Sequence, residues 1–418
     1  MRLFLLILLI SVSSATQAAN TVELFESWRN RVLQVQVIDR QADTKAGIGS
    51  GFFAGQPGWV ITNYHVIAEL LNQPGRYRAR FLADGGIEGD LVLLAVDAVH
   101  DLALLRSSDY QAPALPLAAA LPPRGSRTYS MGFPYDIGLT IVEGTFNGML
   151  KKSLYEKLHF TGSINPGMSG GPALNESGEV VGVNVSTAGN QVSFLVPVQF
   201  VESLVRSADG QDADVDKLNR EVARQLLENQ HQISESLLDR KVKQTVLEGY
   251  KVPGGLADYI NCWGNSQNAE NGGLASVYYR CQTQDDIFLS SSLTTGIIRY
   301  QHEFISGEHF YPMRFYRQLE QRGYYPRLRL EGDEQSVSNY RCRSDFVEHQ
   351  KLPSKVTFCV RRYLKFEGLY DAYLESTSLL KSREALQSTL LLAGFSWENL
   401  VHLSERFIES IGREEHAP

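Results

Sequence analysis

Cysteine and long apolar runs are scarce in this sequence of 418 residues, and an excess of positive charge is lacking, since 40 Lys and Arg face 47 Asp and Glu. None of the four cysteines precedes Cys262, which excludes disulfides and cysteine-bound zinc from the first part of the chain. The formal net charge of -7 gives no general attraction to nucleic acid or to anionic lipid, so neither is an expected partner. The remaining balance, 43% hydrophobic and 21% charged residues, is typical of a soluble globular protein, and the length favours two domains.

One apolar segment does stand out, at the N-terminus. It begins at Leu3, after a single positive charge, and ends near Val12, which is too short to span a bilayer comfortably. Small and polar residues follow it up to Ala18 and Ala19. Residues 1–19 are therefore predicted to be a secretory signal peptide, with an uncleaved anchor as the alternative. We expect an exported protein in a bacterial periplasm, without stable membrane insertion.

The four cysteines predict disulfides, because an even number in an exported chain favours pairing. Sequence permits three connectivities. The short local loops favour the sequential one, Cys262 with Cys281 and Cys342 with Cys359. A zinc site and buried free thiols are the alternatives, and zinc is disfavoured because the cysteines lack C-x-x-C spacing and a suitably spaced histidine. No metal or cofactor is expected.

Residues 21–206 contain many short β-branched or aromatic segments, separated by Gly, Pro, Asn and Asp. Regular spacing of this kind predicts an all-β sandwich or barrel. The segment closes on "VQFVESLVRSADG", where apolar residues recur at helical spacing and Gly210 supplies a stop. We place the first domain at residues 20–208.

A helical linker is predicted for residues 209–250. A helix from Val215 to about Leu247 would carry one apolar face, formed by Leu218, Val222, Leu226, Ile233 and Leu237. Residues 251–418 are predicted to form a mainly α or α+β domain, with short strands around the cysteines and a helical end from about Tyr370 to Ile411. The function of this domain is not evident from the sequence.

The stretch "INPGMSGGPAL", residues 164–174, places Ser169 among glycines and prolines. Such a run permits a tight turn and a close approach of another backbone, and it could direct the N–H groups of Gly167 and Ser169 toward a developing oxyanion. Alone, the pattern more often marks a simple turn. A serine nucleophile also needs a histidine base and a carboxylate to orient that base.

The chain supplies both partners, in the order His, Asp, Ser. His65 follows the strand-like "GWVIT", and Asp101 precedes the apolar strand-like segment "LALLR", a poor position for a charge that has no partner. A single histidine or a single strand-capping aspartate is usually structural. The three together, in the chain order of the chymotrypsin type, predict a Ser-His-Asp triad.

The blocks "GSGFF", "VITNYHVI", "HDLALL", "MGFP", "INPGMSGGPALNESGEVVGVN" and "VSFLVPV" resemble the HtrA/Deg branch of chymotrypsin-fold serine proteases. The resemblance implies two six-stranded antiparallel barrels with the triad in the cleft between them. It also implies roles for individual residues. His65 would be the general base, Asp101 would orient it, Ser169 would form the acyl-enzyme, and the oxyanion hole would consist of Gly167 and Ser169, with Met168 as a third donor.

The same resemblance places the floor of the specificity pocket at Ser163 and Ile164, with Asn184 beside it. No aspartate is present there to bind Lys or Arg, so small or medium aliphatic side chains are expected on the acyl side of the cleaved bond. The strand edge at residues 184–189 is expected to pair with the substrate backbone. Met168 departs from the family, where asparagine is common, and leaves open what steadies the oxyanion loop.

The second half departs further, because it contains no recognisable PDZ domain. Residues 298–330 are dense in Tyr, Phe and Arg, which predicts either a docking surface for a protein partner or a disulfide-stapled core with arginines at its rim. His302 and His309 lack a clear third metal ligand and are interpreted as structural. The sequence thus predicts an exported serine endopeptidase acting on unfolded or exposed polypeptide. The rival interpretation is a catalytically degenerate protease fold that binds partners through its C-terminal domain.

Overall fold

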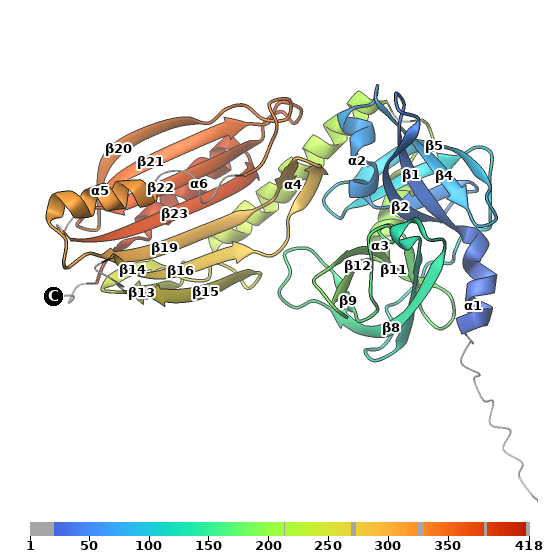
Figure 1. Ribbon diagram of the computed structural model, residues 1–418, viewed down its shortest axis with the longest axis horizontal. Helices are drawn as coiled ribbons and strands as arrows, with labels where there is room; N and C mark the ends of the chain where they lie inside the picture. The colour runs from blue at the N-terminus through green and yellow to red at the C-terminus, as the bar shows by residue number, and fades with distance from the viewer. Residues whose placement is uncertain (1–20, 213, 269–272, 324–329, 380–382, 415–418) are drawn as a thin grey trace, which may run out of the picture.

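A computed structural model describes residues 21–212, 214–268, 273–323, 330–379 and 383–414. The predicted signal peptide, residues 1–19, lies outside them. Figure 1 shows two β-barrels at one end of the molecule and a broad sheet at the other, with a long helix running between them. The predicted barrels are confirmed, because the strands of the first part of the chain close into two antiparallel barrels.

The first barrel has the strand order β1-β2-β3-β6-β5-β4. Its inward-facing residues alternate along β4 (Tyr77–Ala83), where Ala79, Phe81 and Ala83 are buried. Helix α2 closes one end of this barrel. The bounds of these elements are β1 (Val32–Asp39), β2 (Thr44–Phe53), β3 (Trp59–Thr62), α2 (Tyr64–Asn72), β4 (Tyr77–Ala83), β5 (Glu88–Asp97) and β6 (Leu102–Ser107).

The second barrel has the strand order β10-β11-β12-β9-β8-β7, and α3 follows it. Its last strand leads directly into α3, whose buried Val198, Val201 and Leu204 recur at helical spacing against the barrels. The elements are β7 (Arg127–Gly132), η2 (Pro134–Asp136), β8 (Thr140–Met149), β9 (Leu158–Phe160), β10 (Pro172–Leu174), β11 (Val180–Thr187), β12 (Ser193–Pro197) and α3 (Val198–Ser207), preceded in the chain by α1 (Thr21–Trp28) and η1 (Arg29–Arg31).

Helix α4 (Val215–Asp239) joins the two ends of the molecule (Figure 1). Asp214 caps its N-terminus, since its carboxylate accepts the N–H of Asp216. The first half of the apolar face, Leu218, Val222 and Leu226, packs into the core of the first barrel. The second half, Ile233 and Leu237, packs into the core of the C-terminal sheet. One continuous helix therefore contributes to both hydrophobic cores.

The helix ends earlier than the sequence predicts. The chain after Asp239 forms a hairpin of β13 (Gln244–Leu247) and β14 (Tyr250–Pro253), which pairs with β24 (Gly412–Arg413). Residues 244–247, predicted to be helical, instead pair as a strand with β14 across a turn that has positive φ at Glu248 (48°) and at Gly249 (80°).

A seven-stranded antiparallel sheet forms the centre of the C-terminal region, in the order β15-β16-β19-β23-β22-β21-β20. Helices α4 and α6 cover one face, and α5 packs on the other. A separate two-stranded hairpin, β17–β18, connects β16 to β19. The bounds are β15 (Ile260–Gln267), β16 (Ala275–Thr283), β17 (Ile287–Ser290), β18 (Leu293–Thr295), β19 (Ile298–Ser306), α5 (Pro312–Gly323), β20 (Arg341–His349), β21 (Leu352–Arg362), β22 (Tyr370–Ser378), β23 (Glu384–Phe395) and α6 (Trp397–Glu409).

The predicted helical end from Tyr370 to Ile411 is wrong over its first part. β22 and β23 occupy residues 370–395, and α6 alone is helical. The run from Leu390 to Ala393 is buried without interruption, because β23 is a central strand covered on both faces. An apolar run of this kind has no period of two, so the sequence cannot distinguish it from a buried helix. The C-terminal region is mostly β rather than mainly α.

Both disulfides attach an edge strand of this sheet to its neighbour. Cys262 of β15 is bonded to Cys281 of β16, and Cys342 of β20 to Cys359 of β21. In each case the two cysteines stand directly opposite each other in the strand register. This is the sequential pairing that the short loops favour, and no free cysteine occurs among the described residues.

Candidate active site

His65 lies in the first turn of α2, directly after strand β3. The helix buries Tyr64, Ile67, Ala68 and Leu71 against the barrel, which is the spacing of one helical face. His65 stands outside this face, and its side chain keeps 28% of its surface exposed. The helix therefore fixes the histidine backbone while the imidazole stays accessible.

Asp101 occupies the turn between β5 and β6, with φ at 57°. The left-handed region is more accessible to Asp and Asn than to most other residues. From this position the carboxylate reaches His65 twice. Oδ2 lies 2.6 Å from Nδ1, and Oδ1 accepts the backbone N–H at 2.8 Å. The Asp101 carbonyl also accepts a hydrogen bond from the side chain of Asn63 at 2.7 Å, which joins the turn to the residue before α2.

The electrostatics of this pair favour a charged imidazole. Burial lowers the pKa of His65, but the negative charge of Asp101 and its hydrogen bond raise it more, so the pKa of His65 lies above its usual 6.5. A histidine in this setting accepts a proton more readily than one free in water. That is the property required of a general base whose protonated form must be stabilised.

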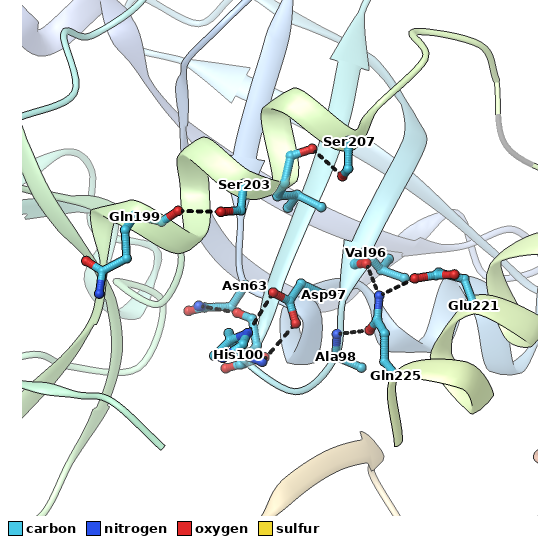
Figure 2. Close-up of polar contacts among 12 residues, drawn as sticks. Asn63, Val96, Asp97, Ala98, His100, Gln199, Ser203, Ser207, Glu221 and Gln225 are labelled. Atoms are coloured by element: carbon cyan, nitrogen blue, oxygen red, sulfur yellow. Dashed lines mark hydrogen bonds and ion pairs between the residues drawn. The ribbon is translucent and has the colours of Figure 1, made fainter. Parts of the chain in front are cut away.

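Neighbouring residues brace the Asp101 turn from outside the barrel. Figure 2 shows the Gln225 side chain of α4 hydrogen-bonded to the backbone of Val96 and Ala98, which lead into this turn. The amide nitrogen donates to the Val96 carbonyl at 2.8 Å, and the amide oxygen accepts the Ala98 N–H at 2.9 Å. His100 is held by Asp97 at 2.7 Å, and its ring stacks on Phe200 of α3 with centroids 3.7 Å apart. The turn is thus supported by both α3 and α4.

Ser169 follows a tight turn in the loop between β9 and β10. The Met168 N–H donates to the Asn165 carbonyl at 2.9 Å, with Pro166 second and Gly167 third in the turn. Gly167 has φ at 98°, and a Cβ there would lie 2.3 Å from the Phe133 carbonyl oxygen. A turn with proline second and positive φ third is of type II, which requires glycine at Gly167.

The same turn orients the Gly167 N–H. The Pro166 carbonyl accepts the Tyr135 N–H at 2.9 Å, so the N–H on the far side of that peptide points the opposite way. Within the described residues, neither Gly167 nor Ser169 uses its N–H in a hydrogen bond. Both remain available to an oxyanion. Met168 does not, because its N–H closes the turn, and the prediction of a third donor at Met168 is wrong.

The Ser169 hydroxyl points along β11. Its Oγ donates to the Val185 carbonyl at 3.5 Å, and it makes no hydrogen bond to His65 within the described residues. Val185 and His65 nevertheless line one common cavity of about 200 Å³. Contacts between a nucleophile and its base are often long without substrate and shorten when substrate binds. Ser169 thus contacts Val185 on the wall of the cavity that His65 lines, without a hydrogen bond to His65 within the described residues.

Two residues steady the loop that carries Ser169. The Met168 side chain is fully buried in an apolar cluster with Ile164 and Phe160. The Asn184 amide donates to the Met168 carbonyl at 3.2 Å and to the Met131 carbonyl at 3.1 Å, and its oxygen accepts from Ser130 at 2.8 Å. Apolar burial at Met168 and the Asn184 amide therefore anchor the oxyanion loop.

The predicted specificity pocket is only partly as expected. Ser163 is exposed, and Ile164 is buried in the apolar cluster beneath it, with its N–H donated to Ser193 Oγ at 3.2 Å. The prediction that Asn184 lines the pocket is wrong, because all its side-chain hydrogen-bonding groups are used inside the barrel and the residue is fully buried. The apolar cluster around Ile164 contains no charged side chain.

The family model of the trypsin-like peptidase domain matches residues 49–183, which include all three triad candidates. This part of the chain is a trypsin-like peptidase domain. Its relatives are HtrA-type serine proteases, as the sequence blocks predict. The mitochondrial serine protease HTRA2 of Bos taurus is 33% identical over 159 residues, covering 36% of this chain and 33% of that protein. The serine endoprotease DegS of Escherichia coli strain K12 is 30% identical over 177 residues, covering 38% and 47%.

Solved structures show a similar limited overlap. Deg5 is 28% identical, with a TM-score of 0.38 over 44% of this chain and 90% of that one. The serine endoprotease from Yersinia pestis is 24% identical, with a TM-score of 0.39 over 45% and 68%. The chain spans about a third to a half of the length of the curated relatives HTRA2 and DegS. The fold assignment of the peptidase domain depends on its two closed barrels.

The described residues contain no group of three potential metal ligands and no helix with the length and apolar character to cross a membrane. His302 is buried, bonds Ser388 Oγ at 2.8 Å and stacks on Phe407, and burial lowers its pKa to about 3. His309 is exposed. These two histidines are therefore in different environments.

Residues 324–329 of the aromatic and basic segment lie outside the described residues, and the part from 298 to 323 is divided between core and surface. Tyr300, Phe310 and Phe315 are buried, which agrees with the interpretation as a core. Tyr311 and Met313 are exposed at the start of α5. The hairpin β17–β18 and Asp285 before it meet the peptidase domain, and neither was predicted from the sequence. No local signal marks them, because their role depends on contacts far apart in the sequence.

Proposed function

We propose that this protein is an exported serine endopeptidase that cleaves unfolded or exposed polypeptide through a Ser-His-Asp acyl-enzyme mechanism. The observation that carries the proposal is the pair of contacts that Asp101 makes with His65, one to the ring and one to the backbone N–H. His65 lines the same cavity as Val185, whose carbonyl accepts the Ser169 hydroxyl. A carboxylate on Nδ1 leaves Nε2 as the proton acceptor. The peptidase domain would comprise residues 20–208, the linker 209–250 and the C-terminal domain 251–418.

The steps follow from the residues in place. His65 Nε2 takes the proton of Ser169 Oγ as that oxygen attacks the substrate carbonyl. The N–H groups of Gly167 and Ser169 donate to the oxyanion, which is usually the largest contribution to stabilisation in acyl transfer. The protonated His65 then gives its proton to the leaving amine, and a water molecule activated by the same histidine hydrolyses the acyl-enzyme.

The cellular role that fits this chemistry is envelope protein quality control or regulated proteolysis in a bacterial periplasm. The name "probable periplasmic serine endoprotease DegP-like" of a Pseudomonas fluorescens relative, 31% identical over 170 residues, supports that location. The N-terminal segment that resembles a signal peptide supports export.

A second candidate function is a binding protein with a degenerate protease domain, acting through its C-terminal region. The absence of a Ser169–His65 hydrogen bond within the described residues favours it. A serine-directed fluorophosphonate probe distinguishes the two. We expect labelling of the wild type, loss of labelling in Ser169→Ala, and unchanged labelling in the control Ser177→Ala, which alters an exposed turn serine. No labelling of the wild type, with an unfolded polypeptide present, would overturn the endopeptidase.

A further inference from the structure

The hairpin β17–β18 of the C-terminal region packs on α2, the helix that carries His65. Its Leu289 carbonyl accepts the Asn72 side chain at 2.8 Å, and Ser291 donates to Glu69 Oε1 through both its N–H and its hydroxyl, at 3.2 and 3.0 Å. Ile287, Leu289 and Leu293 are buried in the same apolar cluster as Tyr64 and Ile67. The hairpin is thereby part of the core of the first barrel, although it comes from a distant part of the chain.

The base of the hairpin is tied to the second barrel. Asp285 accepts hydrogen bonds from Ser153 Oγ at 2.8 Å and from the Leu154 N–H at 2.9 Å, and it pairs with Lys157 Nζ at 2.7 Å. These three partners belong to the segment between β8 and β9. The hairpin therefore bridges the two barrels beside the cleft, and its position relative to the triad candidates is fixed from both sides.

Phe288 is one of three hairpin residues, with Ile287 and Thr294, that line a cavity shared with His65. Its neighbours Ile287 and Leu289 are buried in the core of the first barrel, whereas Phe288 is only partly buried at the edge of that core. The ring meets the His65 imidazole edge-on, with centroids 6.0 Å apart. Phe288 lines the same cavity of about 200 Å³ as His65, Val185 and Ser186. Pockets for drug-sized ligands enclose about 300–1,000 Å³, so this space has the scale of a single side chain.

The free edge of β11 indicates which substrate residue enters this space. At Asn184 the edge opposite β12 is occupied, because the Asn184 N–H donates to Gly171 and its carbonyl accepts from Gly170. At residues 185–187 the strand pairs with β12 but not with β10, which leaves this edge open to an extended segment. Successive side chains of an extended segment point to opposite faces. If the residue whose carbonyl Ser169 attacks directs its side chain to Ile164, the residue before it must point the other way, toward His65 and Phe288.

We propose that Phe288 determines specificity by limiting the size of the substrate residue that precedes the attacked one. This inference rests on the proposed endopeptidase function and assigns to the C-terminal region a part of the substrate site. The Phe288 ring occupies the space beside the imidazole, so a small preceding residue fits and a large one collides with the ring.

The test compares two peptides that differ only at this preceding residue, alanine or leucine. We expect the wild type to prefer alanine in kcat/KM. Phe288→Ala should shift the leucine-to-alanine ratio toward leucine by about tenfold, the low end of what a hydrophobic pocket discriminates. Phe288→Trp should shift the ratio further toward alanine. Phe346→Ala makes the same substitution at a residue that is 71% exposed on β20, and it should leave the ratio unchanged.

Fluorophosphonate labelling of each variant separates failure of this inference from failure of the proposed function. Labelled Phe288→Ala with an unchanged ratio overturns the assignment of Phe288. Equal acceleration on both peptides also overturns it, because that result indicates a general barrier and not selection by size. Unlabelled wild type overturns the endopeptidase itself. If Phe288→Ala does not fold, Phe288→Trp, which keeps an aromatic ring at the hairpin, still decides the direction of the shift.

Discussion

Asp101 holds His65 with both oxygens of one carboxylate, at 2.6 Å from Nδ1 and at 2.8 Å from the backbone nitrogen. The second bond fixes the carboxylate to the backbone of α2, and this restrains the distance between Nδ1 of His65 and its acceptor oxygen. With the proton placed on Nδ1, the Nε2 atom presents its lone pair to the cleft. Asp101 thus acts on the orientation of His65 as well as on its charge.

Asp101→Asn should lower kcat/KM by about 10⁴-fold, the loss seen when a triad aspartate becomes an amide and the imidazole adopts the wrong tautomer. It should also move the acidic limb of the pH profile. Because Asp101 raises the pKa of His65 above 6.5, wild-type activity is lost as pH falls through a value above 6.5. The variant lacks that charge, so its limb should lie at lower pH. A pH profile of kcat/KM measures both, and an unmoved limb would contradict the assigned role.

Gly167→Ala should reduce kcat by about 10²–10³-fold, the usual effect of losing one oxyanion donor. The new Cβ would lie 2.3 Å from the Phe133 carbonyl oxygen at a positive φ, so the turn must rearrange and the N–H must turn away. Gly75→Ala is the matched control, since no atom lies within 4 Å of its added Cβ. Steady-state kinetics on one peptide test the pair. Equal activity of the two variants would remove Gly167 from the oxyanion hole.

The peptidase domain could be predicted from sequence because its functional residues lie in short contiguous motifs. Gly167 requires a positive φ, Ser169 follows it directly, and each block lies within one turn or strand. Asn184 was harder to interpret, because a polar residue beside a predicted pocket is expected to line it. Its amide instead satisfies two carbonyls inside the barrel, a role visible only when the strands are packed.

The C-terminal region was less predictable for two physical reasons. Leu390 to Ala393 are buried on both faces of a central strand, so the period that identifies strands is absent. Phe288 and Asp285 act across more than one hundred residues of sequence, in contacts with His65 and Lys157. Neither position carries a motif, and only the three-dimensional packing brings them to the cleft.

Reduction of the disulfides should loosen the edges of the C-terminal sheet and leave the barrels intact. Each bond closes a short loop, with sequence separations of 19 and 17, and loops of this length contribute about 3 kcal/mol each in the chain-entropy account. Hydrogen exchange should therefore rise in β15 and β20 after reduction, while β1 to β12 keep their protection. Alkylation of any cysteine before reduction, or early loss of protection in the barrels, would contradict this expectation.

Asp285→Ala should detach the hairpin base from the second barrel. Asp285 is 7% exposed and Lys157 22%, so the substitution leaves a poorly solvated ammonium and an unpaired Leu154 N–H. Breaking a buried pair from one side costs about 3–5 kcal/mol, and the residual exposure of Lys157 places this case near 3 kcal/mol.

Asp209→Ala is the matched control. It removes the same side chain from an ion pair with Lys217 in which Asp209 is 53% and Lys217 64% exposed, so the loss of stability should be far smaller. Denaturant unfolding of both variants compares the two costs. Because the hairpin carries Phe288, Asp285→Ala should also relax discrimination between peptides with alanine and leucine before the attacked residue, whereas Asp209→Ala should not. A destabilised Asp285→Ala with wild-type discrimination would show that α2 alone positions the hairpin, and that the bond to the second barrel serves stability only.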